Sequence, residues 1–467
     1  MHPRPTTALA LALALAACGP KASTDSAVDS ASDAATGTGP ATGTPSGTTT
    51  PTGTDTTTTT DTSSDLDALE AALWAAYLAA APPDWVPTPT DTRVEQSLTF
   101  GSSTMRYTVE RRGASSDPVP LYIALHGGGG AEAWVNDSQW EGMQTYYRDS
   151  VSDGIYVAPR GISNNWNLHF ESDSYPLYDM LVERMIVQEN VDPDRVYLLG
   201  FSAGGDGVYQ VAPRLADRWA GANMSAGHPN GTPSDNLANV PFLIQMGELD
   251  TAYDRHTEAA RYSQQLDGLE TAHPGLYTHA LFLHKDGTHN SPWSDRDPSG
   301  ADYPVIRDPD AWLSVGDRSS IDVDSNAVHW LDDHARAPHP RQLVWALGTW
   351  AEREGRELAH YWLAVDSEHR DVGRVEAGYD PADNSVRLAA TDVLAVRVRL
   401  NHRMLDLAAP IVFRVDDLEV PVELAPSEDL MAATLALRGD PRQIYSVEVL
   451  VEWTADGVTV TPVTAAE

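Results

Sequence analysis

The residues with the clearest chemistry lie in the stretch G-F-S-A-G at 200–204. An apolar run at 196–199 comes directly before it, and a helical pattern follows from Asp206. A serine between a buried strand and a helix sits on a sharp turn that exposes its hydroxyl, and the flanking glycines allow the close packing there. The pattern predicts Ser202 as a nucleophile, with a tight glycine turn carrying a passive serine as the alternative.

A serine hydroxyl needs an adjacent base, usually a histidine, to become a good nucleophile. His284 and His289 both follow the last apolar run of the central segment. Because Gly287 opens a loop between them, we predict that His289 reaches Ser202 and acts as the base. The two histidines also have the H-x4-H spacing of a metal site, which is a third interpretation.

The base needs a carboxylate that orients its ring and stabilises its charged form. Asp250 follows the apolar run at 242–246 and lies between the serine and the histidine in the chain. This is the order Ser…Asp…His that such sites have when the serine occupies a G-x-S-x-G turn. Asp250 is therefore the predicted acid, and Asp254 and Glu248 are the alternatives.

Four consecutive glycines, beginning at Gly127, follow His126 and an apolar run at 121–125. Glycines let backbone N–H groups approach a developing oxyanion. We expect the amides of Gly128 and Ala203 to form an oxyanion hole, with Gly127 beside them. A phosphate loop is disfavoured, because no G-K-[ST] follows the glycines and the surroundings are acidic.

Further side chains are candidates for the substrate pocket. They follow the predicted strands or the glycine loop and comprise His126, Trp166, Asn167, Phe201 and His228. The alternatives are a surface loop anchored by Trp166 and a loop-holding role for His228. Asp295 begins a segment that resembles a calcium loop, but Pro298 and the lack of an acid at the twelfth position favour a solvated acidic turn. We predict no metal and no cofactor.

The elements that must position these residues alternate along the chain. Apolar runs lie at 121–125, 155–158, 196–199, 219–224, 242–246 and 277–283, with helical periodicity at 178–189 and 257–269. This alternation predicts an α/β fold with a mostly parallel sheet covered by helices. Ligands bind beyond the carboxyl ends of such strands. A hairpin is expected before the sheet, at 93–100 and 105–111.

Together these motifs resemble the alpha/beta hydrolases, and among them the secreted esterases related to polyhydroxybutyrate depolymerases and to feruloyl or acetylxylan esterases. The resemblance covers about 93–339 and depends on the segments 126–130, 194–204, 225–229, 247–255 and 287–289. It implies a triad of Ser202, Asp250 and His289. The segment 291–326 departs from the family's pattern, and we expect it to act as a lid or rim.

The only cysteine, Cys18, follows an apolar run at 8–17 and ends the sequence L-A-A-C. The run is too short to cross a bilayer and is typical of a signal peptide. Its end resembles a bacterial lipobox. We expect a signal peptide at 1–17, a lipid anchor on Cys18, and a membrane-anchored or secreted protein outside the cytoplasm. A cysteine that follows a signal peptide by chance is the alternative.

Composition divides the rest of the 467-residue chain. The segment 18–64 is rich in Thr, Ser, Gly, Pro and Asp, which predicts a disordered tether. We expect a helix and linker at 65–92, with the helix packed on the main domain, and a hydrolase domain at 93–340. Alternating apolar residues predict a small antiparallel β domain at 341–467. We expect that domain to serve in packing, and carbohydrate binding is the alternative.

The net negative charge of the chain argues against one class of function. The chain has 31 Lys and Arg against 67 Asp and Glu, a formal net charge of −36. Nucleic-acid binding requires a basic surface, so we do not expect this protein to bind nucleic acid.

The motifs together predict a serine hydrolase for an ester substrate, simple or polymeric. The alternatives are a non-catalytic cell-surface binding protein on a hydrolase scaffold and a serine peptidase or thioesterase.

Overall fold

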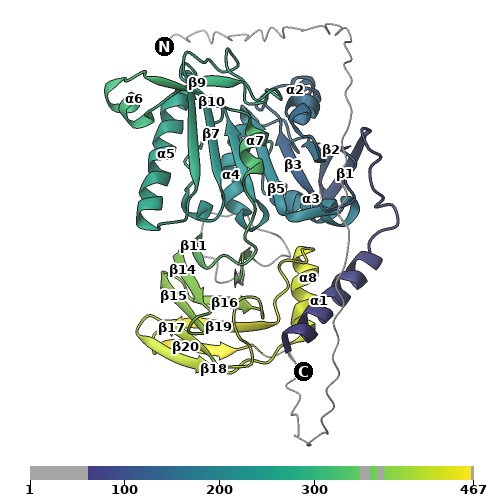
Figure 1. Cartoon of the computed structure of the whole chain (residues 1–467), viewed down its shortest axis with the longest axis vertical. Coiled ribbons are helices and arrows are strands. Elements are labelled where there is room, and N and C mark those ends of the chain that lie inside the picture. Colours follow the sequence, from purple (N-terminus) through teal and green to yellow (C-terminus); the bar gives the residue numbers. More distant parts are fainter. Residues whose placement is uncertain (1–61, 348–357, 367–372, 464–467) are drawn as a thin grey trace, which may run out of the picture. The chain divides into compact units, whose positions relative to one another are not determined.

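The computed structural model describes residues 62–347, 358–366 and 373–463 (Figure 1). The predicted signal peptide, Cys18 and nearly all of the predicted tether lie outside the described residues, and their assignments stay predictions. Within the described residues, no helix is long and apolar enough to cross a bilayer.

A ten-stranded sheet positions the candidate site (Figure 1). Its order is β1-β2-β4-β3-β5-β6-β7-β8-β9-β10. The strands from β4 to β8 in this order run parallel, and antiparallel pairs extend both edges. The bounds are β1 Arg93–Phe100, β2 Ser103–Arg112, β3 Val119–Leu125, β4 Gly154–Pro159, β5 Val191–Phe201, β6 Gly221–Ser225, β7 Phe242–Gly247, β8 His279–His284, β9 Asp302–Ile306 and β10 Ser320–Asp324. The mostly parallel sheet confirms the predicted α/β fold.

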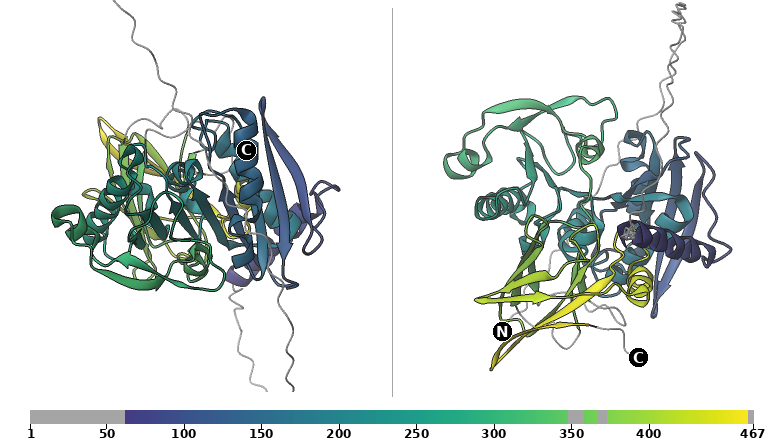
Figure 2. Two further views of the ribbon diagram at one scale, coloured as in Figure 1. Left: turned by 90° about the horizontal axis from the view of Figure 1, so that it is seen from above. Right: turned by 60° about the horizontal axis from the view of Figure 1, so that its bottom comes forward.

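Helices cover both faces of the sheet (Figure 2). They are α2 Ala133–Tyr146, α3 Ser174–Glu189, α4 Ala203–Arg214, α5 Arg255–Ala272 and α7 Ala327–Asp332. Strand β3 shows why both faces must be covered: Leu121 and Ile123 pack in the core under α3 and α4, whereas Tyr122 and Ala124 pack in a second core under α2 and α7. A strand that is buried on both faces is apolar throughout, as the sequence of β3 is.

The segment 291–326 is not a lid. It forms β9, the short helix α6 (Pro309–Val315) and β10, and β9 and β10 extend the sheet beyond β8. None of its residues lines the pocket at Ser202. The expectation of a lid or rim was wrong because these strands are short and largely exposed, so that their sequence lacks the apolar pattern of a sheet strand.

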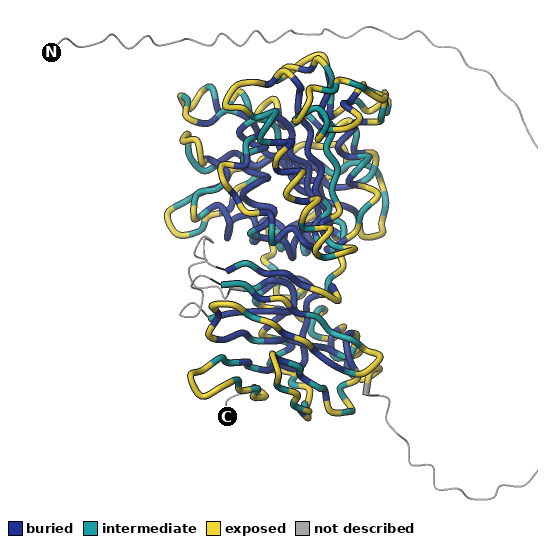
Figure 3. Tube along the Cα trace, turned by 90° about the vertical axis from the view of Figure 1, so that its left-hand side faces the viewer, coloured by how far each residue is buried: buried dark blue, intermediate teal, exposed yellow. Residues whose placement is uncertain are grey.

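The C-terminal part is a β domain with two five-stranded sheets. The first is β11 Gln342–Leu347, β14 Gly373–Asp380, β15 Ser385–Thr391, β17 Ile411–Val415 and β18 Leu418–Val422. The second is β12 Leu358–His360, β13 Leu363–Val365, β16 Ala395–Leu400, β19 Val447–Thr454 and β20 Gly457–Pro462. The pairing is antiparallel, as predicted, except between β15 and β17. Buried residues alternate with more exposed ones along β14 and β15, whereas β20 has no buried residue (Figure 3).

Two helices pack beside this domain (Figure 1). They are α1 (Thr62–Ala79), the predicted N-terminal helix, and α8 (Glu428–Arg438). Leu66 of α1 joins Met431, Leu435 and Ile444 in a small apolar core. Helix α1 therefore packs mainly on α8, and a hydrogen bond from Tyr77 to Glu183 links it to α3 of the main domain.

A buried network of charges joins the β domain to the main domain. Arg218, whose side chain is fully buried, forms an ion pair with Asp179 at 2.6 Å and lies 3.7 Å from Asp440. Arg336 reaches the same Asp440 carboxylate at 2.8 Å. Buried ions are tolerated only when they are paired and hydrogen-bonded. Each arginine here therefore keeps a buried carboxylate neutralised.

Candidate active site

Ser202 occupies a strained turn at the carboxyl end of β5. The strand ends at Phe201 and α4 begins at Ala203, which leaves Ser202 with φ 59° and ψ −121°. A side chain at Gly204 would overlap the carbonyl of Leu125 in β3. The glycine is thus required by packing, and the strain at Ser202 is typical of a nucleophile turn.

The structure brings the three predicted catalytic residues together. His289 Nε2 lies 3.1 Å from Ser202 Oγ, and His289 Nδ1 lies 2.6 Å from Asp250 Oδ2. A carboxylate at Nδ1 holds the proton on that nitrogen. Nε2 is then free to accept the hydroxyl proton of Ser202, which is the geometry of a general base and its nucleophile.

The alternative base, His284, lies elsewhere. Its ring is fully buried, stacks on Trp293 at 4.4 Å and bonds through Nε2 to Gln245 Oε1 at 2.9 Å. Burial lowers the pKa of His284 to about 3, so that the ring stays neutral. His284 and His289 thus point into separate surroundings, which argues against the H-x4-H metal interpretation.

Backbone bonds hold the acid and base loops together. The N–H of Glu248 donates to the carbonyl of His284, and the N–H of Leu249 donates to the carbonyl of Gly287, at 2.9 and 2.6 Å. Arg255 adds a side-chain contact of 3.3 Å to the second oxygen of Asp250. No sequence pattern indicated this role of Arg255, because the role depends on where Asp250 lies in space.

The segment 291–326 supports the acid loop from outside. Arg318 donates to both carboxylate oxygens of Glu248, at 2.6 and 2.7 Å, and Trp312 Nε1 donates to the same group at 3.2 Å. Glu248 lies two residues before Asp250. The alternative acid Glu248 is thus occupied in holding the loop, and the insertion helps to position Asp250.

Gly128 and Ala203 both line the pocket at Ser202. Gly128 has φ +105°, and a side chain there would overlap the Asn136 amide oxygen, which accepts the N–H of Gly129 at 2.8 Å. Buried Asn136 therefore fixes the glycine loop, a role that the sequence did not reveal. The N–H of Ala203 is among the first of α4 and has no acceptor within the helix. Both amides are available for an oxyanion, whereas Gly127 lies beside Ser202 without lining the pocket.

The pocket has a volume of about 420 Å³. Its walls include the predicted Trp166, Asn167 and His228, together with Phe170 from the same loop as Trp166, and also Asp206, Asn230, Tyr253 and Arg255, which sequence reasoning missed. Trp166 and Tyr253 are 58% and 70% exposed, and their rings meet edge to face at 6.4 Å. Exposed aromatic rings at a pocket mouth can pack against a substrate.

Two predicted wall residues lie behind the pocket instead. The His126 ring is fully buried, donates through Nδ1 to the carbonyl of Gly127 at 2.6 Å and accepts the N–H of Gly161 at 3.0 Å. Phe201 packs between Tyr146 and His289, with ring centres 5.3 and 5.4 Å away. His126 therefore links two loops and Phe201 supports the base.

His228 has both of the roles that the sequence allowed, in the pocket wall and in holding its loop. It lines the pocket, and its Nδ1 accepts the N–H of Asn230 at 2.9 Å, which holds its own loop. Its backbone N–H donates to Asp206 at 2.7 Å. Burial raises the pKa of the Asp206 carboxyl, which lies in the same wall.

The predicted acidic turn at Asp295 is partly wrong. Asp295 is fully buried and accepts hydrogen bonds from Tyr147 at 2.7 Å and Tyr146 at 3.2 Å. Asp297 instead accepts from Ser299. Asp295 and Asp297 thus have different hydrogen-bond partners. Among the described residues, Asp295 belongs to no group of three or more side chains spaced to bind a metal.

Comparison with known proteins gives partial matches. No family model matches the chain. The putative esterase NocK of Nocardia uniformis subsp. tsuyamanensis is 29% identical over 167 residues, 33% of this chain and 43% of that protein. The match thus spans less than half of that relative's length.

The solved structures that match the chain are distant. A thermostable esterase is 16% identical over 53% of this chain and 64% of its own, with a TM-score of 0.38. A ferulic acid esterase is 15% identical over 44% and 93%, with a TM-score of 0.30.

Proposed function

We propose that the protein is a serine hydrolase that cleaves carboxylic esters through an acyl-enzyme. The observation that carries this proposal is the continuous hydrogen-bond chain from Ser202 Oγ through His289 to Asp250, at the edge of a pocket. The partial match to a putative esterase supports the ester as substrate class.

The geometry supports a two-step reaction. Ser202 Oγ bonds to the ester carbonyl carbon while its proton passes to His289 Nε2, and Asp250 stabilises the charged ring. The amides of Gly128 and Ala203 bind the oxyanion, where one lost donor typically costs about 3 kcal/mol of transition-state stabilisation. His289 then returns the proton to the leaving alcohol. In the second step water, activated by His289, releases the acid from Ser202.

A matched panel of esters, thioesters and anilides with one acyl group tests this substrate class. The panel is needed because the triad alone does not choose the leaving group. We expect kcat/KM to be highest for the oxygen esters, in line with the partial match to a putative esterase. A higher kcat/KM for the anilide or the thioester would assign a peptidase or a thioesterase instead.

Replacing Arg318 with methionine tests the supporting role of the insertion. We expect kcat for ester hydrolysis to fall about tenfold with little change in KM, because small misplacements of catalytic groups cost up to about 100-fold. Arg307→Met, an exposed position in the same insertion, is the control and should keep full kcat. Equal kcat values in the two variants would show that the Glu248 contacts do not position Asp250.

We also propose that the chain is anchored outside the cytoplasm by a lipid on Cys18. The proposal is supported by the apolar run at 8–17 and the L-A-A-C sequence that ends it. A Cys18→Ala variant should leave the membrane fraction, and its retention there would contradict the anchor.

A further inference from the structure

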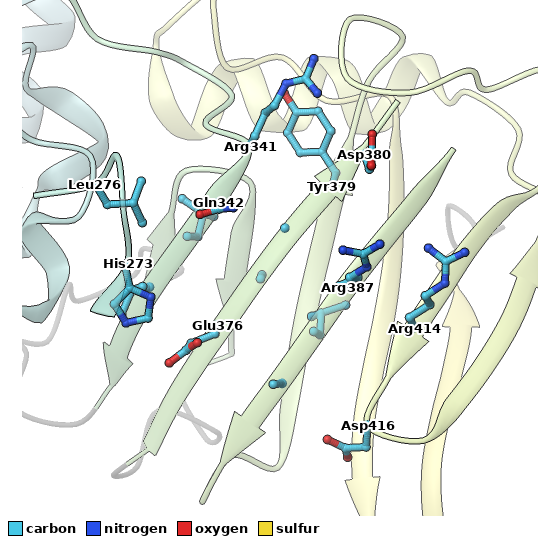
Figure 4. A pocket seen from close by; sticks show the side chains of 16 residues that line it. His273, Leu276, Arg341, Gln342, Glu376, Tyr379, Asp380, Arg387, Arg414 and Asp416 are labelled. Atoms are coloured by element: carbon cyan, nitrogen blue, oxygen red, sulfur yellow. The ribbon is translucent and has the colours of Figure 1, made fainter. Parts of the chain in front are cut away.

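A groove of about 790 Å³ crosses one face of the sheet formed by β11, β14, β15, β17 and β18 (Figure 4). It is larger than the pocket at Ser202 and is lined by other residues. His273 and Leu276, from the loop between α5 and β8, close one end. The mechanism proposed above does not use this groove.

Strand register places its polar side chains in two rows. In the first row Gln342 is opposite Gly378, Gly378 is opposite Arg387, and Arg387 is opposite Arg414. In the second row Glu376 is opposite Ala389, and Asp416 follows the end of β17. Residues two apart in a strand share a face and lie about 7 Å from each other. A donor-rich row therefore runs beside an acceptor-rich row.

Small residues leave the space between the rows open. Gly378 interrupts the first row and Ala389 the second, and together they form the open floor of the groove on a face whose neighbouring positions are mostly long and polar. A glycine inside a strand weakens it and often marks a place where a ligand approaches the backbone. Here Gly378 lies between Gln342 on β11 and Arg387 on β15.

The donors of the groove are largely unused. Arg414 forms ion pairs with Asp383 and Glu419 at 2.8 and 3.3 Å. The side chains of Arg387 and Arg341 form no hydrogen bond or ion pair within the described residues, and the Arg341 guanidinium lies 5.9 Å from the centre of the Tyr379 ring. Figure 4 shows Arg387 beside Arg414, with Glu376 and Asp416 further along the strands.

The charges select the kind of ligand. Three arginines and three carboxylates line the groove, so that a ligand of either charge meets repulsion from one row. The small residues on the floor offer no deep pocket for the aromatic anchors that protein partners use. A chain of sugars suits the groove, because each hydroxyl both donates and accepts hydrogen bonds, toward the acids on one side and the arginines on the other.

We propose that this groove binds an uncharged polysaccharide, laid across the strands between the two rows. The site is separate from Ser202, so that the proposal stands or falls independently of the ester chemistry. It would hold the protein on a polymer while the pocket at Ser202 acts on ester groups nearby.

Affinity electrophoresis of the full chain in native gels tests the proposal. The gels contain arabinoxylan, glucomannan or mixed-linkage β-glucan, with polygalacturonate as the charged comparison. We expect retardation by at least one neutral polymer, and at least tenfold weaker binding in Ala389→Trp, whose indole fills the exposed floor. Thr459→Trp, at an exposed position on β20 in the other sheet, is the matched control and should bind normally.

Each outcome decides the proposal. Normal binding by Ser202→Ala, together with unchanged hydrolysis of a small soluble ester by Ala389→Trp, would place the binding in the groove. No retardation by the three neutral polymers, equal binding by Ala389→Trp and Thr459→Trp, or stronger retardation by polygalacturonate would each overturn the proposal. If the unaltered protein bound a neutral polymer but hydrolysed no ester, the binding result would stand and the proposed function would be contradicted instead.

Discussion

Ser202→Ala is expected to lower kcat for ester hydrolysis by about 10⁵-fold while leaving the unfolding temperature nearly unchanged. The variant loses the oxygen that bonds to the carbonyl carbon, so that only the oxyanion hole and substrate binding remain to accelerate attack by water. Stopped assays with a short p-nitrophenyl ester, and thermal unfolding of the same sample, measure the two quantities.

The double variant Ser202→Ala/His289→Ala is the control for this prediction. Residues that act as a unit are strongly non-additive, so that the double variant should be no slower than Ser202→Ala alone. A kcat of Ser202→Ala within tenfold of that of the unaltered protein would contradict the proposed mechanism. A double variant slower by the product of the two single effects would show that the two side chains act separately.

Arg218→Met is expected to have the largest effect on stability. The change removes the cation that lies 2.6 Å from the buried Asp179 carboxylate, while Asp440 keeps its ion pair with Arg336. Breaking a buried pair in this way costs about 3–5 kcal/mol. Denaturant unfolding should show this loss in the free energy of unfolding. Because the network joins the β domain to the main domain, the loss should extend to both.

Arg261→Met provides the matched comparison. Arg261 pairs with Glu258 on the surface of α5, and its side chain is 56% exposed. Exposed pairs contribute about 0–1 kcal/mol, so this variant should unfold almost as the unaltered protein does. Equal free energies of unfolding for the Arg218 and Arg261 variants would contradict the buried network.

The succession of strands along the chain and the site at their carboxyl ends could be predicted because the information is local. Strand β3, the second half of β5 and most of β7 are apolar, and a functional residue or loop follows each within a few residues. Parallel strands bring such ends to one edge of a sheet. Ser202, Asp250 and His289 therefore lie together although up to 87 residues separate them.

The parts that were missed depend on contacts between distant residues. Helix α2 is largely polar, with Trp134 exposed, and only Asn136, Trp140 and Met143 buried, so that its apolar pattern is weak. Strand β10 has no buried residue, which hid the extension of the sheet. The partners of Arg218 and Arg318 are far away in the chain, and no spacing in the sequence indicates them.

Intact-mass analysis after treatment with a fluorophosphonate tests the central claim most directly, because this probe bonds to a serine only when an adjacent base activates it. The account predicts one adduct per chain, located on Ser202 by peptide mapping, and none in Ser202→Ala. An unlabelled protein, or an adduct on a different residue, would contradict the account.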